Sequence, residues 1–213
     1  ELREAADKRA EAGGELAFLL EPDLMDSRGG LRDVQAMQAV AAAWVASAPG
    51  PRVREAYELL LDIRHALHLV TARGSDRLVL QEQDAVAAAL GLLDAEALMR
   101  RVAEAGRTIA HALDGTWRTV DRLLNGPAPR GRRPLADGVV EHGGEVVLAR
   151  GVNPRHDPVL VLRAAAAAAE AGLPLSPAAV ATLAAQSPPM PVPWPTEARD
   201  ALVALLGAGR AAV

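Results

Sequence analysis

The sequence predicts a mainly α fold: a helical bundle with one short extended segment and a small β-hairpin. Half of the 213 residues are apolar, yet aromatic residues make up only 2% of the chain. The core must therefore consist largely of Leu, Val, Ile and Ala, which suits closely packed helices. Apolar residues also recur every three or four positions over long stretches, as on one face of an α-helix.

Composition also bounds the function. The chain contains no cysteine, which excludes disulfides and thiolate metal sites and is compatible with a cytoplasmic protein. The net charge of −4 is spread along the sequence without runs, whereas nucleic-acid-binding proteins usually carry a basic patch. No apolar run reaches membrane-spanning length. We therefore expect neither a nucleic acid nor a membrane as partner.

The extended segment is expected at residues 16–20 (LAFLL), a short apolar run after a glycine pair. Side chains of a strand alternate between its two faces, so Glu21 and Asp23 would project from the same face. Gly29 and Gly30 then permit a sharp turn before a helical pattern begins. A carboxylate pair, a glycine turn and a helix N-terminus form a plausible environment for a metal ion and a phosphate.

The alternative for this segment is structural. Glycines before a helix often serve backbone geometry, and Arg32 and Asp33 would then be capping and surface charges. Glu21 and Asp23 would pair with Arg28 or Arg32 and only fix the turn. The segment contains neither a Walker lysine nor a G-x-G-x-x-G motif, so its spacing does not establish nucleotide binding.

Helices are expected in order over 31–48, 52–73 and 83–90, each ending at proline, glycine or a charged turn. The longest follows Asp94, a good N-cap, and runs to Leu124 as the spine of the bundle. The expected apolar stripes are Leu31, Val34, Gln38, Ala41, Trp44 and Val45 on the first helix, and Leu98, Val102, Ala105, Ile109, Leu113, Trp117, Val120 and Leu124 on the longest.

Residues 127–137 are expected to form an exposed linker, because prolines and glycine alternate with three arginines there (PAPRGRRP). This linker would separate a helical domain over 1–126 from a second domain over 138–213. Both assignments rest on the change in composition, since prolines and glycines interrupt helical patterns. The sequence therefore predicts two parts joined by a solvated connection.

The second part is expected to contain a β-hairpin and three helices. Valines on both sides of the turn His142-Gly143-Gly144 predict the hairpin. Asp157-Pro158 and Ser176-Pro177 each predict a helix start, because a capping side chain precedes a proline at the first helical position. A last helix is expected over 196–206, after a proline-rich connector.

A second charged block lies at the end of the helix over 52–73. Arg64 and His68 are four residues apart and share one helix face, and Arg73, Asp76 and Arg77 follow the helix. In the structural interpretation, Asp76 pairs with an arginine and locks the helix to the next segment. In the functional interpretation, Arg64, Arg73 or Arg77 binds nucleotide or stabilises the loop around the first block. Arginine binds phosphate and carboxylate equally well, so both interpretations stand.

The two blocks carry a family resemblance. Glu21 to Gln35 (EPDLMDSRGGLRDVQ) resembles the segment that follows the nucleotidyltransferase core of bacterial bifunctional PII uridylyltransferase/uridylyl-removing enzymes. Residues 62–80 (DIRHALHLVTARGSDRLVL) are similar to a helix and turn of the same family. Weaker similarity continues to about Leu124. The resemblance implies the central helical segment between the nucleotidyltransferase core and a metal-dependent HD phosphohydrolase domain.

The resemblance also implies an activity. The parent enzyme would transfer a nucleotidyl group from UTP, or from ATP, to a tyrosine of the PII signal-transduction protein and so control nitrogen assimilation, with Mg²⁺ polarising the triphosphate. Partners would be PII and the adjacent nucleotidyltransferase and HD domains of the same chain. Nucleotidyltransferases of this general fold use a third acid from a neighbouring strand. Glu21 or Asp23 would be that catalytic acid, with Asp23 as the metal ligand.

The chain departs from the family in lacking its other signatures. The paired-aspartate pattern of the transferase and the metal ligands of the hydrolase are absent, and His156-Asp157 is interpreted as a chance pair beside a helix start. The chain also begins without methionine and looks like an excised middle piece. We therefore expect it to be inactive alone and to hold no tightly bound cofactor. The alternative is a non-catalytic helical adaptor or interaction module.

Overall fold

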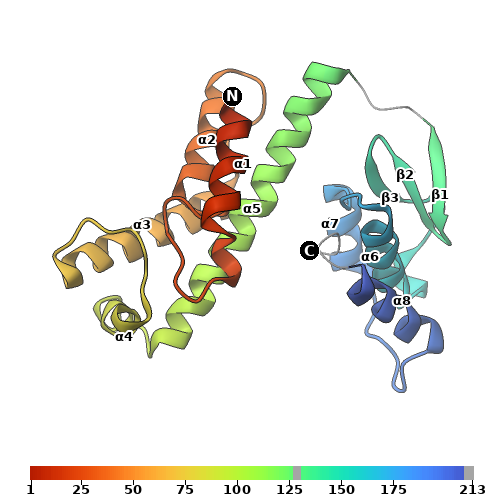
Figure 1. The fold of residues 1–213 in the computed structure, drawn as a ribbon. Coiled ribbons are helices and arrows are strands. Elements are labelled where there is room, and N and C mark those ends of the chain that lie inside the picture. Colours follow the sequence, from red (N-terminus) through yellow and green to blue (C-terminus); the bar gives the residue numbers. More distant parts are fainter. Residues whose placement is uncertain (127–130, 209–213) are drawn as a thin grey trace. The chain divides into compact units, whose positions relative to one another are not determined.

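The computed structural model describes residues 1–126 and 131–208 (Figure 1). Contacts within the chain divide it into two compact units, Glu1–Gly126 and Pro127–Val213, which we call unit 1 and unit 2 and describe separately. Both are built mainly of helices, and a small antiparallel sheet lies in unit 2. The predicted mainly α class is therefore confirmed.

Unit 1 is organised around one long helix. Its elements are α1 (Leu2–Gly13), the short 3₁₀ helix η1 (Leu16–Phe18), α2 (Leu31–Ala42), α3 (Pro51–Thr71), α4 (Leu80–Ala89) and α5 (Ala95–Asn125). Helix α5 contacts η1, α2, α3 and α4, so it is the spine that the sequence predicts (Figure 1).

The start and the buried face of α5 agree with the sequence. Asp94 Oδ1 accepts a hydrogen bond from the backbone N–H of Ala97 at 2.8 Å, as an N-cap does. The buried residues of its stripe are Leu98, Val102, Ala105, Ile109, Leu113 and Trp117. Towards the end of the helix the stripe leaves the core, since Val120 is half-buried and Leu124 is exposed.

The expected stripe of α2 is wrong in its second half. The helix ends at Ala42, earlier than predicted, and buries Leu31, Val34, Met37 and Val40. Trp44 lies past this end with a positive φ of 60° and is 95% exposed. The left-handed backbone turns the chain out of the helix, so helical spacing no longer places Trp44 on the buried face.

The predicted strand at residues 16–20 is also wrong. Leu16–Phe18 forms a 3₁₀ turn in which Leu16 is buried, whereas Phe18 is 61% and Leu20 is 75% exposed. Two isolated bridges, Glu15 with Arg28 and Asp23 with Arg77, replace a continuous ladder. A short apolar run without an adjacent strand has no ladder to join, so only Leu16 of the run is buried, and its side chain lies beside Gly106 of α5.

Unit 2 combines a three-stranded antiparallel sheet with helices. Its strands pair in the order β1 (Arg132–Ala136), β2 (Val139–His142) and β3 (Glu145–Leu148). The predicted hairpin is confirmed as β2 and β3, with His142 opposite Glu145 at the Gly143-Gly144 turn. Strand β1 corrects the predicted linker, of which residues 127–130 lie outside the described part of the chain. Pro134 is tolerated because β1 is an edge strand.

The helices of unit 2 follow the expected order, although the first begins at Leu160, two residues after the predicted first position Pro158. They are α6 (Leu160–Ala171), α7 (Pro177–Gln186) and α8 (Thr196–Gly207), with a short η2 (Pro154–His156) before α6. Asp157 Oδ1 accepts hydrogen bonds from the N–H groups of Val159 and Leu160, and Ser176 Oγ accepts one from Ala179. The core of the unit consists of Val139, Val146, Leu160, Ala164, Ala167, Ala168 and Leu183.

Within residues 1–126 and 131–208, the helices of both units are too short or too polar to span a membrane.

Candidate functional site

The two charged blocks of the sequence meet in unit 1. The backbone N–H of Leu24 donates to the carbonyl oxygen of Asp76, and the N–H of Leu78 donates to the carbonyl oxygen of Pro22, each over 2.9 Å. These hydrogen bonds flank the bridge between Asp23 and Arg77. We call this junction of residues 20–27 with residues 76–83 the bracket. It joins the acidic loop before α2 to the turn between α3 and α4.

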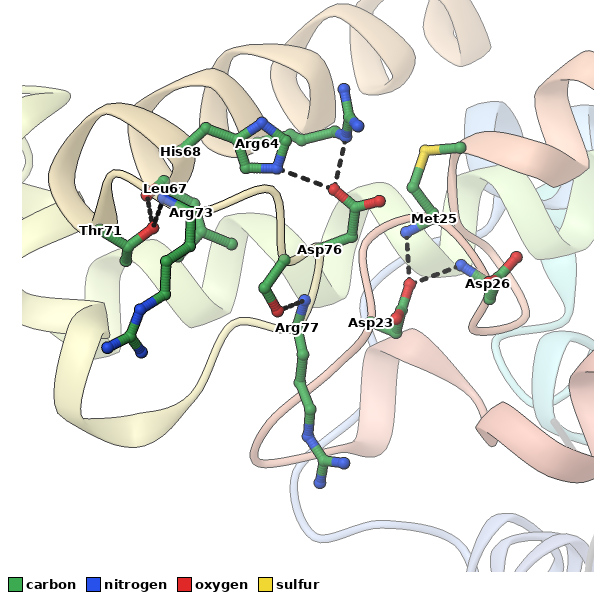
Figure 2. Close-up of polar contacts among 11 residues, drawn as sticks. Asp23, Met25, Asp26, Arg64, Leu67, His68, Thr71, Arg73, Asp76 and Arg77 are labelled. Atoms are coloured by element: carbon green, nitrogen blue, oxygen red, sulfur yellow. Dashed lines mark hydrogen bonds and ion pairs between the residues drawn. The ribbon is translucent and has the colours of Figure 1, made fainter.

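Asp76 fastens the bracket to α3 (Figure 2). Its Oδ1 accepts a hydrogen bond from Arg64 Nε at 2.7 Å and lies 2.9 Å from His68 Nε2. Arg64 and His68 occupy one face of α3, as their spacing predicts, and all three side chains are partly buried. The Asp76–arginine pair of the structural interpretation is therefore present.

Arg73 takes no part in this cluster. It is exposed, and no carboxylate within the described residues lies within ion-pair distance of it. Figure 2 shows its guanidinium directed away from the Asp76 carboxylate. Its ordered contact is through the backbone, where its N–H donates to Thr71 Oγ1 at 3.3 Å.

Glu21 fastens the bracket to α4. Its Oε1 accepts a hydrogen bond from the backbone N–H of Leu80 at 3.1 Å, and its Oε2 lies 3.4 Å from Arg77 Nη2. Leu80 is the first residue of α4, and the first N–H groups of a helix lack intrahelical partners. Glu21 therefore caps α4 from a segment remote in sequence, and its negative charge lies at the favourable end of the helix dipole. Both of its carboxylate oxygens are occupied.

Asp23 folds the acidic loop on itself. Its Oδ1 accepts hydrogen bonds from the N–H groups of Met25 at 2.9 Å and Asp26 at 2.7 Å (Figure 2). Its Oδ2 accepts no hydrogen bond from any residue that the structure describes. The buried Ser27 completes the turn, because its Oγ accepts from the N–H of Asp23 and donates to the carbonyl oxygen of Gly13.

These contacts correct the expected partners of the two acids. Neither Glu21 nor Asp23 pairs with Arg28 or Arg32. Arg28 Nη2 contacts both oxygens of Asp114 on α5, at 2.7 and 2.8 Å, and Arg32 Nε lies 2.5 Å from Asp26 Oδ1. The acids also do not project from one face of a strand, because the segment that carries them is a loop. Sequence spacing missed Ser27 and Asp114 because both act across the fold.

Gly29 and Gly30 allow close backbone packing within unit 1. Gly29 has a φ of 86°, and a Cβ there would lie 2.5 Å from the carbonyl oxygen of Gly106 on α5. A Cβ on Gly30 would lie 2.7 Å from the carbonyl oxygen of Ser27. The predicted sharp turn is present. The close approach that the structure contains is to α5 and to the loop itself.

Asp33 is a buried group, which corrects the expected surface charge. Its carboxylate is 7% exposed, and its Oδ2 accepts a hydrogen bond from the N–H of Gly29 at 2.7 Å. Arg9 Nη2 on α1 lies 3.7 Å from Oδ1. Burial raises the pKa of Asp33, although the Gly29 N–H and the cations Arg9 and Arg28 oppose that rise. Asp33 therefore ties α1, the glycine turn and α2 together.

Gln83 is a member of the bracket that sequence patterns did not indicate. It lies on α4 and is 3% exposed. Its Nε2 donates to the carbonyl oxygens of Leu20 at 2.8 Å and Leu78 at 3.2 Å. The sequence signal that could have identified it is its spacing: Gln83 lies three and four residues before Val86 and Ala87, on the buried face of α4. A polar group at such a position is normally hydrogen-bonded.

The described residues do not form a complete metal site. No group of three or more His, Asp or Glu side chains in residues 1–126 and 131–208 is placed to hold an ion. Asp23 Oδ2 is one suitable oxygen, since magnesium prefers oxygen ligands, but Glu21 is committed to α4 and Arg77. His156 ends η2, and the carboxylate of the next residue, Asp157, accepts from the N–H of Leu160 and forms an ion pair with Arg163.

A protein-family model matches the part of the chain that contains the bracket. The model of the GlnD PII-uridylyltransferase family matches residues 1–48 and 38–117, which contain the whole bracket. No solved structure matches the chain significantly.

Curated relatives match along nearly the entire chain. A bifunctional uridylyltransferase/uridylyl-removing enzyme of Streptomyces coelicolor is 57% identical over 100% of this chain, and one of Mycobacterium tuberculosis is 43% identical over 98%. A third, of Corynebacterium glutamicum, is 36% identical over 92%. In each case the match spans 28% of the relative's own length. The chain therefore belongs to the GlnD PII-uridylyltransferase family and corresponds to about a quarter of the length of these members.

Proposed function

We propose that this chain is the central helical segment of a bifunctional uridylyltransferase/uridylyl-removing enzyme, and that the bracket holds one edge of the transferase site. The parent would uridylylate the PII protein in the cytoplasm and thereby control nitrogen assimilation. The observation that carries the proposal is that the two blocks resembling the family meet in the bracket through backbone hydrogen bonds. Residues so far apart in sequence share a pattern because they build one piece of structure.

In the transfer reaction, Asp23 and Glu21 would have different roles. In the parent, Mg²⁺ would be held by carboxylates and would polarise the triphosphate of UTP, or of ATP. Asp23 can offer its free Oδ2 to such an ion, while its Oδ1 stays fixed by two N–H donors. The other ligands would come from the remaining parts of the parent. Glu21 acts indirectly, by holding the loop against α4.

Substitutions in the full-length parent test this proposal. Asp23→Asn keeps an oxygen for the loop N–H groups but removes the charge, so transfer should fall by about 10²-fold or more if Asp23 contacts the metal. Uridylyl removal and melting temperature should change little. Asp26→Asn is the matched control, because Asp26 lies in the same loop and pairs with Arg32. Equal losses of transfer, removal and melting temperature would refute a role for Asp23 at the reaction centre.

A helical adaptor without chemistry is the second candidate. The hydrogen bonds of the bracket favour it. Glu21, Asp76 and one carboxylate oxygen of Asp23 all accept hydrogen bonds from donors within unit 1. On this view the chain connects its neighbouring domains and Asp23→Asn leaves transfer unchanged.

The isolated chain is proposed to be inactive on either view. Incubated with PII, Mg²⁺ and UTP, it should leave PII unlabelled, because no group of three or more His, Asp or Glu side chains among its described residues is placed to hold an ion. Stoichiometric labelling of PII by the pure chain would refute this.

A further inference from the structure

Gln83 lies where both halves of the bracket can be held by one side chain. Leu20, whose carbonyl oxygen it binds, directly precedes Glu21. Leu78, whose carbonyl oxygen it also binds, directly follows Arg77. The Glu21–Arg77 ion pair thus lies between the two backbone points that the Gln83 amide grips.

The hydrogen bonding of Gln83 is specific to its amide group. Two donors on one buried nitrogen serve two carbonyl oxygens, and a carboxylate or thioether of the same length would supply none. Because α4 is a rigid support, the amide fixes the position of the acidic loop relative to the helix N-terminus that Glu21 caps. Without it, the loop keeps the Leu24–Asp76 and Leu78–Pro22 hydrogen bonds but loses its attachment at Leu20.

We propose that Gln83 is a positioning residue for the transfer reaction, which sets the place of the acidic loop through Leu20 and Leu78. The inference rests on the proposed function, because it concerns the same loop and the same reaction. It adds a residue that contacts neither nucleotide nor metal. Its effect reaches Asp23 through the short segment from Leu20 to Asp23, which Leu78 holds at Pro22.

The test compares two glutamines of one helix in the full-length enzyme. Gln83→Met keeps the volume and removes both donors, whereas Gln81→Met changes an exposed glutamine on the same helix. Loss of a hydrogen bond that positions a reacting group typically lowers the rate by about 10- to 100-fold. We expect a loss of that order in the kcat of transfer for Gln83→Met. Uridylyl removal, melting temperature and the Gln81→Met enzyme should stay close to wild type.

A second variant keeps the test decisive if Gln83→Met folds poorly. Gln83→His retains one ring N–H at a similar reach, so its transfer rate should lie between those of wild type and Gln83→Met. Hydrogen exchange at the Leu24, Leu78 and Leu80 amides should be slowest in wild type, faster in Gln83→His and fastest in Gln83→Met. If removal and melting temperature fall together with transfer in both variants, Gln83 is merely structural and the inference is wrong. Unchanged transfer in Gln83→Met would also overturn it.

The outcome is separable from that of the proposed function. If Asp23→Asn leaves transfer unchanged, the proposed function fails whatever Gln83 does. If Asp23→Asn abolishes transfer while Gln83→Met does not reduce it, only the positioning role fails.

Discussion

The two units fix their loops in different ways. In unit 1, side chains of the acidic loop and of α4 bind the backbone of the two facing segments, as Glu21 and Gln83 do in the bracket. In unit 2, ion pairs of one arginine link α6 to the segment before it and to α8. Arg163 on α6 donates to Asp157 at 2.8 Å and to Glu197 on α8 at 2.6 Å.

The match to the family model follows the same division between the units. Polar side chains that bind backbone atoms need one residue type at each position, so they leave recognisable blocks in the sequence. The buried alanines of α6 pack in an apolar cluster with valines and leucines, where the main requirement is small size. The family model accordingly matches residues 1–117, within unit 1, although curated relatives align beyond that region. Substitutions that remove contacts in one unit and leave those of the other unit intact test this comparison.

Gly29→Ala should have the largest effect. Its positive φ and the 2.5 Å approach of a Cβ to Gly106 O leave no room for a side chain, so the free energy of unfolding should fall by about 2–4 kcal/mol. Urea denaturation measures the loss, and hydrogen exchange should localise it to unit 1. Gly74→Ala is the control, because nothing lies within 4 Å of a Cβ there. A similar loss in both variants would contradict the close-packing explanation.

Arg163→Met should destabilise unit 2 by about 1–2 kcal/mol. The Arg163 side chain is 14% exposed, and its removal leaves two carboxylates without their cation, although exposure of Glu197 limits the cost. Faster hydrogen exchange in α6 and α8, with no change in unit 1, is the expected signature. Arg199→Met removes an exposed arginine of α8 and should be silent. Exchange that rises throughout both units would show that Arg163 is not a local tie.

Asp76→Ala should lower the free energy of unfolding of unit 1 by about 1 kcal/mol. The change removes the charged acceptor of Arg64 and the contact with His68, both partly exposed. Chemical denaturation measures it, with Asp62→Ala on the exposed face of α3 as the matched control. If Asp76→Ala matches this control, the contacts of Asp76 with α3 do not stabilise the bracket.

Asp33 should produce the smallest effect, visible as a pH dependence. Because burial raises its pKa in the folded state, the folded chain binds this proton more tightly than the unfolded chain does. The stabilisation is therefore complete at acid pH, below the ordinary pKa of an aspartate. It is lost as the pH rises through the raised value. Asp33→Asn retains an acceptor for Gly29 N–H, so the stability difference between wild type and variant should shift towards the variant as pH rises. A difference that does not change with pH would contradict this.

The fold was largely predictable because its signals are local. The stripe and N-cap of α5, the hairpin turn and the caps at Asp157 and Ser176 all depend on residues within a few positions of each other. The misses depend on remote partners. Residues 16–20 needed a neighbouring strand, which residues 1–126 and 131–208 do not provide, and β1 forms because β2 offers an edge.

The candidate site shows the same division. Sequence spacing placed Arg64 and His68 on one face and marked Asp76 as their neighbour. It could not show that Glu21 caps α4 or that Asp33 is buried beside Arg9, because these partners come from other elements. The catalytic roles of Glu21 and Asp23 remain predictions.

The bracket has a consequence for the order of folding. Its hydrogen bonds close a chain segment that contains all of α2 and α3, and closing a flexible loop of that length costs entropy before any contact forms. Once the two helices have formed and packed on α5, they bring Leu24 and Asp76 together at little further cost. The bracket should therefore assemble late, with low φ-values for Gln83 and Asp76 and high ones along α3 and α5. Substitutions in it would then act mainly on the rate of unfolding.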